Sequence, residues 1–296
     1  MKHNALAGSF FERNLKYIFP LPAAVFIILL MAFPIVYTLF VSFSDWALTS
    51  GRPLTLAGFK SYIDVIKDSR FLNAVLRTFA FTFGVVAAET VLGTIIALVL
   101  NNDFRGKGLL KFLLLLPLVV TPVAIGIVFN LFYDPTIGFL NYILSVLHLP
   151  QSGWVTETST VMQALMLVDI WQWTPMIALI MLAGLSGLPH EVFESARVDG
   201  AGGVQTFFHI TLPMIMPTML TALVLRAVDA LKTYDIIYAM TRGGPGYSSE
   251  TLNIYAFKLS FEYFEMGRSS VSLVFLFLIV LFFSLGVMKL RTRFEV

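Results

Sequence analysis

Six long apolar stretches constrain the fold of this chain more than any other feature of its sequence. Each is long enough to cross the hydrocarbon core of a bilayer, which takes about 20 mostly apolar residues in a helix. Lipid offers no partner to a free backbone polar group, so each span is expected to be helical. The sequence therefore predicts an all-α, polytopic membrane protein with six transmembrane helices, near residues 17–42, 73–100, 109–133, 161–186, 214–239 and 269–290.

The composition fits a membrane protein and argues against several other classes. Apolar residues make up 57% of the chain and charged residues 13%, about half the usual charged share of a soluble domain. The net charge is +2 and the basic residues are scattered, so nothing resembles a nucleic-acid footprint. Cysteine is absent, and the histidines are too scattered for a metal site. No catalytic, cofactor or metal site is therefore predicted in the chain.

Both termini are expected on the cytoplasmic side of the membrane. Six spans place them together, and basic residues in short loops mark the inner side. The segments DFRGKG and KLRTR are basic, whereas the loop 134–158 holds no lysine or arginine. The expected division is a cytoplasmic N-terminal segment (1–16), a six-helix transmembrane domain (17–290) whose first span is not cleaved, and a cytoplasmic tail (291–296).

A polar interruption, SGLPHEVFESARVDGAGGVQTFFHITLP, separates the fourth and fifth spans. Pro189 suits the first turn of a helix, and the acidic residues that follow suit the positive end of the helix dipole. Gly200 suits a left-handed cap that ends this helix. A second short helix is expected over residues 204–211. The loop at about 187–213 is thus predicted to be a helix–turn–helix on the cytoplasmic side.

Two interpretations of this loop remain open on the residues alone. Ser195 and Ala196 are small enough to let another surface approach, and Phe207 and Phe208 would be costly in water. This combination suits a knob that docks in a groove of another protein. Paired phenylalanines on a connector also often pack back on their own bundle.

The same stretch resembles the EAA signature of permease subunits of ATP-binding-cassette (ABC) importers. That signature reads E-A-A, three residues, G, nine residues, I-x-L-P, and its spacing is intact here with Ser at the second position. The segments DGA, TRGGPGYSSETLNIYAF, GFKSYIDVI and FRGKG are similar to the carbohydrate-uptake branch, which includes maltose-type and glycerol-phosphate-type permeases. The matching positions are Glu194, Ser195, Ala196, Gly200, Ile210, Leu212 and Pro213.

The resemblance implies a type I ABC importer-like fold in which this loop is a coupling helix seated in a cleft of an ATPase. It implies that Glu194 makes the polar contact, that Gly200 supplies the turn, and that Asp199 and Phe207 belong to the same surface. The chain lacks a G-x-x-x-x-G-K-[ST] phosphate loop. ATP and Mg²⁺ are therefore expected on a separate chain, and this chain is not expected to be an enzyme.

The implied assembly has several partners in the plasma (inner) membrane of a bacterium or archaeon. They are a second, related permease that is often a different chain, two ATP-binding subunits, and an extracytoplasmic solute-binding protein. The implied cargo is a sugar or sugar derivative, with oligosaccharides, glycosides and glycerol-phosphate-type solutes all open.

A second candidate site begins with the segment VDIWQWTP in the fourth span. Sugars are bound by aromatic rings stacked on their C–H faces and by carboxylates and amides that hydrogen-bond their hydroxyls. The alternative is an aromatic belt at the membrane interface. The residues expected along a translocation path are Asn130, Tyr133, Asp169, Trp171, Trp173, Tyr234 and Asp235.

Other ionisable groups in the spans are expected to hold the helices together. Arg226 and Asp229 lie three residues apart and are predicted to pair on one helix face, and Glu89 could stitch two helices. In the first outer loop, the apolar spacing from Phe59 to Ile66 predicts an amphipathic helix on the membrane surface.

Two other function classes compete with the importer reading. A secondary transporter driven by an ion gradient would also use acids within the membrane, but it has no use for an exposed helix–turn–helix. A membrane-embedded enzyme would need a convergent acid/base or metal constellation, and the sequence contains none that we recognise.

Overall fold

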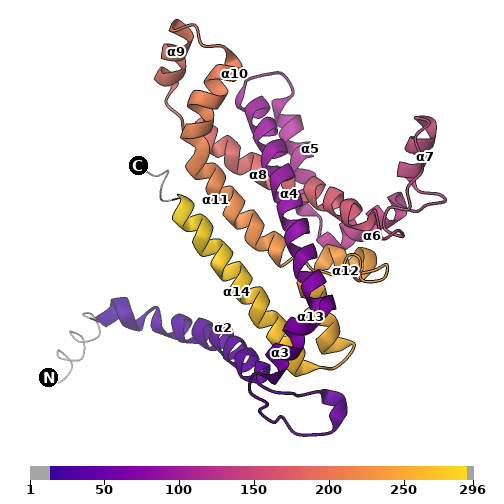
Figure 1. Ribbon diagram of the computed structural model, residues 1–296. Coiled ribbons are helices and arrows are strands. Elements are labelled where there is room, and N and C mark those ends of the chain that lie inside the picture. The colour runs from indigo at the N-terminus through magenta and orange to yellow at the C-terminus, as the bar shows by residue number, and fades with distance from the viewer. Residues whose placement is uncertain (1–13, 292–296) are drawn as a thin grey trace, which may run out of the picture.

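The computed structural model describes residues 14–291 and confirms an all-helical membrane architecture (Figure 1). Within this part of the chain, the only extended pairing is one antiparallel bridge between Ser44 and Leu56. Five helices are long and apolar enough to cross a membrane, and a sixth candidate is a helix pair bent by 99°. The predicted segments 1–16 and 291–296 lie almost wholly outside the described residues.

The helices follow one another without any intervening sheet. In chain order they are α2 (Leu21–Ser42), the 3-10 turn η1 (Leu48–Ser50), α3 (Lys60–Lys67), α4 (Ser69–Asn101), α5 (Lys107–Val119), α6 (Pro122–Phe132), α7 (Phe139–Val146), α8 (Val161–Ser186), α9 (His190–Val198), α10 (Gly203–Thr206), the π-helical turn η2 (Phe207–Thr211), α11 (Leu212–Leu231), α12 (Asp235–Thr241), α13 (Leu252–Phe261) and α14 (Met266–Arg291).

Glycines let the helices at the centre of the bundle approach one another closely. A Cβ atom on Gly93 of α4 would lie 2.7 Å from the side chain of Ile177 on α8. A Cβ atom on Gly184 of α8 would lie 2.8 Å from Thr218 on α11. Small residues let helix backbones approach in membranes, where no hydrophobic effect drives helices together. These two positions therefore set the spacing of α4, α8 and α11.

Two of the predicted spans are broken in the structure. The third, 109–133, is the bent pair, because Pro122 at the start of α6 has no N–H with which to continue the helix from α5. The fifth, 214–239, ends at Leu231, and α12 begins separately at Asp235. Apolar residues continue through the first break, so hydropathy did not reveal it, whereas the predicted fifth span was drawn across the polar run KTYD at the second break.

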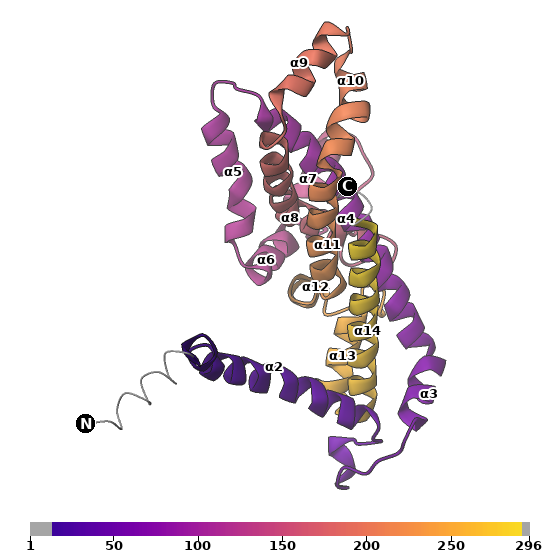
Figure 2. The ribbon, with the colours of Figure 1, turned by 90° about the vertical axis from the view of Figure 1, so that its left-hand side faces the viewer.

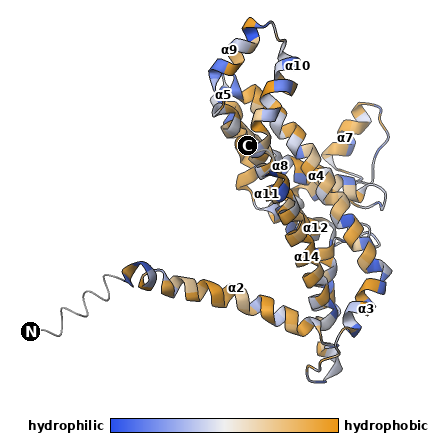
Figure 3. Ribbon diagram, turned by 60° about the vertical axis from the view of Figure 1, so that its left-hand side comes forward, coloured by the Kyte–Doolittle hydropathy of each residue, from blue (hydrophilic) through white to orange (hydrophobic). Residues whose placement is uncertain are grey.

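The molecule has two distinct ends and one outlying helix. Figures 1 and 2 show α9 and α10 projecting at one end of the bundle and α3 lying at the other, with α2 diverging from the bundle. Figure 3 shows that α2 is hydrophobic along most of its length, whereas α9 and α3 carry hydrophilic residues. Only 6% of the most apolar window of the helix Asn14–Ser42 is buried, so most of α2 is left for lipid or another chain to cover.

The predicted amphipathic helix in the first outer loop is α3. Its Ser61 and Val65 face the protein, and Ile63 and Ile66 are about half exposed, at 50% and 48%. Its placement on the membrane surface stays a prediction.

Candidate functional site

The loop between α8 and α11, residues 187–213, forms an elbow at one end of the molecule (Figure 1). Helix α9 ends at Val198, and Gly200 follows in the left-handed region at φ +77°. The Gly200 N–H donates to the Arg197 carbonyl (3.1 Å) and the Ala201 N–H to the Ala196 carbonyl (2.9 Å). This pair of bonds is the Schellman pattern, so the predicted glycine cap is confirmed.

The second arm of the elbow differs from the prediction. No separate helix spans 204–211, because α10 runs through the π-helical turn η2 into α11 as one continuous helix, Gly203–Leu231. Pro213 does not interrupt it and follows the π-helical turn η2, in which the Leu212 N–H donates to the Phe207 carbonyl five residues back. The elbow therefore consists of α9, the capped turn at Gly200 and an extension of the span α11.

The outer surface of the elbow is apolar at several points. Val198 is 87% exposed, Val204 75% and Phe208 58%. Phe207 is partly buried and meets Phe208 edge-on, with ring centroids 5.0 Å apart. The phenylalanine pair thus packs partly on itself and leaves one ring open.

Some of the residues that match the EAA signature and its surroundings are buried in the structure, and others are exposed. Ala196 is buried at 6% exposure, so this structure closes it to a partner. Ile210 and Leu212 are partly buried. The exposed members are Glu194, Ser195, Asp199, Gly200 and Pro213.

A cavity of about 380 Å³ lies where the two helix breaks meet. Pro122 at the α5–α6 bend lines it, as do Lys232 and Tyr234 at the α11–α12 break. Broken helices in membranes are tolerated where the freed backbone lines a cavity, and they often mark solute sites in transporters. Gln172 helps to satisfy the first break, because its Nε2 donates to the Val120 carbonyl at 3.4 Å.

Four of the seven predicted path residues meet at this cavity. They are Asp169, Trp173, Tyr234 and Asp235. The structure does not bring the other three there. The Tyr133 hydroxyl donates to the Ala164 carbonyl, and the Asn130 amide donates to the Met240 carbonyl.

Trp171 also lies elsewhere. It lines a separate apolar groove between α4, α5 and α8, 47% exposed and in ring contact with Phe129. Trp171 and Trp173 are two residues apart, so a helix turns them about 200° away from each other. This placement agrees with the membrane-facing alternative for Trp171.

The predicted pairing of Arg226 with Asp229 is wrong. The Arg226 guanidinium donates to both carboxylate oxygens of Glu89, at 2.7 and 3.0 Å, and also to Asp169. All three side chains are at most 1% exposed, and they come from α11, α4 and α8. Asp229 pairs instead with Lys232 at 3.4 Å near the cavity, with both side chains half exposed. Tertiary packing therefore outweighed the local spacing, and Glu89 does link helices.

Gln172, Arg226, Lys232 and Thr233 line the cavity as well. Sequence reasoning did not place Arg226, Lys232 or Thr233 on a solute path. Gln172 is 2% exposed, and its Oε1 atom has no hydrogen-bond partner in the described chain. A buried acceptor beside a cavity is suited to receive a hydroxyl from a solute. The sequence does carry a signal for these residues, the polar run KTYD after an apolar stretch, but the predicted fifth span was drawn across it.

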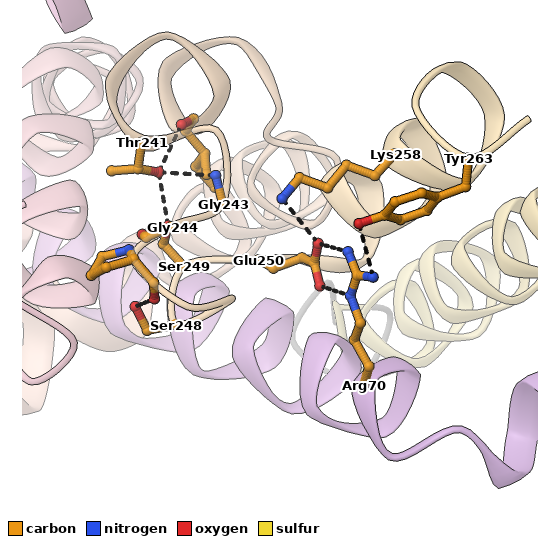
Figure 4. Close-up of polar contacts among 11 residues, drawn as sticks. Arg70, Thr241, Gly243, Gly244, Ser248, Ser249, Glu250, Lys258 and Tyr263 are labelled. Atoms are coloured by element: carbon orange, nitrogen blue, oxygen red, sulfur yellow. Dashed lines mark hydrogen bonds and ion pairs between the residues drawn. The ribbon is translucent and has the colours of Figure 1, made fainter.

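A second polar cluster holds the loop 241–250 in place (Figure 4). The buried Glu250 carboxylate accepts two hydrogen bonds from Arg70, both 2.7 Å, and lies 3.4 Å from the Lys258 ammonium. Thr241 and Ser249 close the loop through their hydroxyls at 2.8 Å. These contacts tie the turn to the start of α4 and to α13, so the turn is fixed rather than free.

Asp68 extends this network beside α4. Burial alone would raise its pKa, but the Tyr255 hydroxyl, the Arg70 backbone N–H and the Arg268 guanidinium together hold the pKa below the usual carboxyl value. The charged form of Asp68 is thus favoured in the folded chain.

Among residues 14–291, no group of three or more histidine or acidic side chains is arranged to hold a metal ion.

Comparison with known proteins gives concordant matches. Residues 89–294 match the family model described as "Binding-protein-dependent transport system inner membrane component". A probable ABC transporter permease protein of Sinorhizobium fredii is 35% identical over 85% of this chain and 82% of its own. The trehalose/maltose transport system permease protein of Thermococcus litoralis is 32% identical over 94% of each chain. A chain of a bacterial alginate ABC transporter, solved with an alginate pentasaccharide-bound periplasmic protein, superposes with a TM-score of 0.83 at 19% identity, covering 96% of both chains.

Proposed function

The chain belongs to the family of binding-protein-dependent transport system inner membrane components, and we propose that its elbow and its cavity perform separate steps of solute import. It is a membrane-spanning, non-enzymatic permease subunit of an ABC importer that works with a solute-binding protein. The elbow receives force from an ATPase, and the cavity passes the solute.

The observation that carries the coupling role is the shape of the elbow. Its cap is closed by two hydrogen bonds, its second arm is continuous with α11, and its tip exposes Val198, Val204 and Phe208. An apolar tip on a rigid support suits a cleft in another protein. ATP and Mg²⁺ are held by that partner, and the closing of the ATPase rotates α8 and α11 as rigid bodies. Glu194, exposed on the same arm, makes the polar contact.

The lining of the cavity suits a neutral, hydroxyl-rich solute such as a sugar or glycoside. Trp173 offers an aromatic face, and the free Oε1 of Gln172 accepts a hydroxyl. The cations of the lining already face acids, since Arg226 is held by Glu89 and Asp169 and Lys232 lies beside Asp229. No unpaired cation of the described lining is left for an anion. The trehalose/maltose relative agrees with this choice of solute.

The assembly that we propose contains a second, related permease, two ATP-binding subunits and an extracytoplasmic binding protein. The elbow lies on the cytoplasmic side, with both termini, in the inner or plasma membrane of a bacterium or archaeon. The exposed apolar surface of α2 supports a neighbour in the membrane, because this helix touches its own bundle mainly at its last turns.

Uptake by proteoliposomes tests this function against ion-coupled transport. The complex is purified with its ATPase and reconstituted into liposomes that contain ATP. Entry of radiolabelled trehalose and maltose is then measured with the cognate binding protein outside. We expect uptake that requires internal ATP and persists when ionophores collapse every ion gradient. Uptake that needs a gradient and ignores ATP would establish a secondary transporter instead.

A further inference from the structure

The loop between α6 and α8 carries a helix, α7, that stands away from the bundle (Figure 1). Phe139, Tyr142 and Val146 of α7 are 55%, 67% and 58% exposed. Spacings of three and four residues place these side chains on one helix face. Since α8 ends beside the elbow, α7 precedes the opposite end of α8 and lies at the far side of the bundle.

The loop that presents this face is a folded support. Asn141 is 3% exposed, and its amide donates to the carbonyls of Pro135 (3.2 Å) and Ser152 (2.9 Å). Its Oδ1 accepts from the Trp154 indole at 2.8 Å, and the Trp154 ring stacks on Tyr133 at 4.8 Å. The outward face of α7 is therefore held in a fixed position relative to α6 and α8.

The central part of the same loop, between Asp134 and Glu157, is unusual in having no charged residue. Residues 135–156 contain no Asp, Glu, Lys or Arg. Beyond α7 itself, Ile137 is 83% exposed, Leu147 60% and Leu149 50%. Contiguous apolar surface of this kind is uncommon on a water-facing loop and marks contact with a protein or a membrane.

The apolar surface of α7 is continuous with that of a membrane-embedded helix. Ile127 and Leu131 of α6 are 57% and 65% exposed, and α6 is half of the bent span. The rings of Phe132 on α6 and Phe139 on α7 are in contact, with centroids 6.0 Å apart. A soluble binding protein, which docks and leaves in each cycle, would meet a more polar surface with a charged rim.

We propose that α7 is an interfacial anchor, which inserts Phe139, Tyr142 and Val146 into the lipid of the membrane leaflet remote from the elbow. Amphipathic and apolar helices of this kind sit about 5–10 Å deep at the boundary of headgroups and acyl chains. Tyr142 suits that depth because its ring is apolar and its hydroxyl can reach water. The anchor fixes the outer ends of α6 and α8 against the bilayer while the elbow moves the inner ends.

Spin labels measure this insertion directly, because the chain has no cysteine of its own. Single variants Tyr142→Cys and Val146→Cys are labelled with a nitroxide in the full complex, in nanodiscs of phosphatidylethanolamine and phosphatidylglycerol. Collision with oxygen, which concentrates in lipid, is compared with collision with a water-soluble nickel chelate. Leu285→Cys on the exposed side of α14 serves as the lipid reference, and Asp103→Cys, on a fully exposed loop side chain, as the water reference.

We expect the labels at 142 and 146 to favour oxygen over nickel, at a depth of about 5–10 Å below the lipid phosphates. The matched variant Ser145→Cys, exposed on the flank of α7, should lie shallower. Nickel access equal to that of Asp103→Cys would overturn the proposal. Exclusion of both reagents would assign the face to the second permease, and exclusion only after adding the binding protein would assign it to that protein.

Discussion

Arg226 shows how much one side chain holds together in this molecule. Its guanidinium joins Glu89 of α4 and Asp169 of α8 to α11, and it lies 5.3 Å from the ring centroid of Trp173 at the cavity. A buried ion group is costly to form, but removing one partner leaves charge with no compensation. The triad therefore sets the positions of the helices that frame the cavity.

Replacing Arg226 with methionine should destabilise the complex severely. Two carboxylates would be left buried without a cation, which costs about 3–5 kcal/mol by comparison with other buried pairs. The thermal midpoint in detergent, followed by size-exclusion chromatography, measures the loss. Lys60→Met is the control, since Lys60 and Asp45 form an exposed pair worth less than about 1 kcal/mol. Equal midpoints for the two variants would contradict the role of the triad.

The Gly200→Val substitution should uncouple transport while the chain stays folded. A side chain at φ +77° is strained by about 1–2 kcal/mol or more, although nothing lies within 4 Å of the new Cβ. Gly202→Val is the matched control, because Gly202 has equal space and an ordinary φ of −71°. Copurification of the ATPase should fall for Gly200→Val and persist for Gly202→Val. Normal uptake by Gly200→Val would count against a role of the turn at Gly200 in docking to the ATPase.

At the scale of helices, the sequence predicted what hydropathy can report and missed what tertiary structure decides. Long apolar runs predicted four of the spans well. Gly200 predicted the end of α9 because the left-handed conformation that ends a helix favours glycine. The break at Pro122 was missed because apolar residues continue through it, and the break after Leu231 was missed because the predicted span was drawn across the polar run KTYD. The cavity was found only in part for the same reason, since it is built from those breaks.

The start of α4 offers a test at this scale. Asp68 has a folded-state pKa below the ordinary carboxyl value, so its contribution to stability is present above that value and is lost as the pH falls through the folded pKa. Asp68→Asn should therefore lower the thermal midpoint at pH 7. The difference from wild type should shrink as the pH falls below about 4. A difference that does not change with pH would show that the charge of Asp68 is not what stabilises α4.

At the scale of the whole molecule, this chain is one subunit of a larger transporter. Its elbow ends in exposed apolar side chains, α2 is left largely uncovered, and the chain has no phosphate loop of its own. The sequence predicted that partners are needed, because the spacing of residues 194–213 resembles the EAA signature of importer permeases. What covers α2 depends on the surface of its neighbour, which this sequence does not contain.

Photo-cross-linking from the tip of the elbow is the most direct test of the central claim, that a separate ATPase drives this permease through residues 187–213. The photoreactive residue p-benzoylphenylalanine replaces Val198, which is 87% exposed, in cells that make the whole importer. Illumination should join this chain to an ATP-binding subunit identified by mass spectrometry, and the same residue at Tyr142 should not. Cross-links from position 198 to lipid alone, in a complex that still imports solute, would contradict the account.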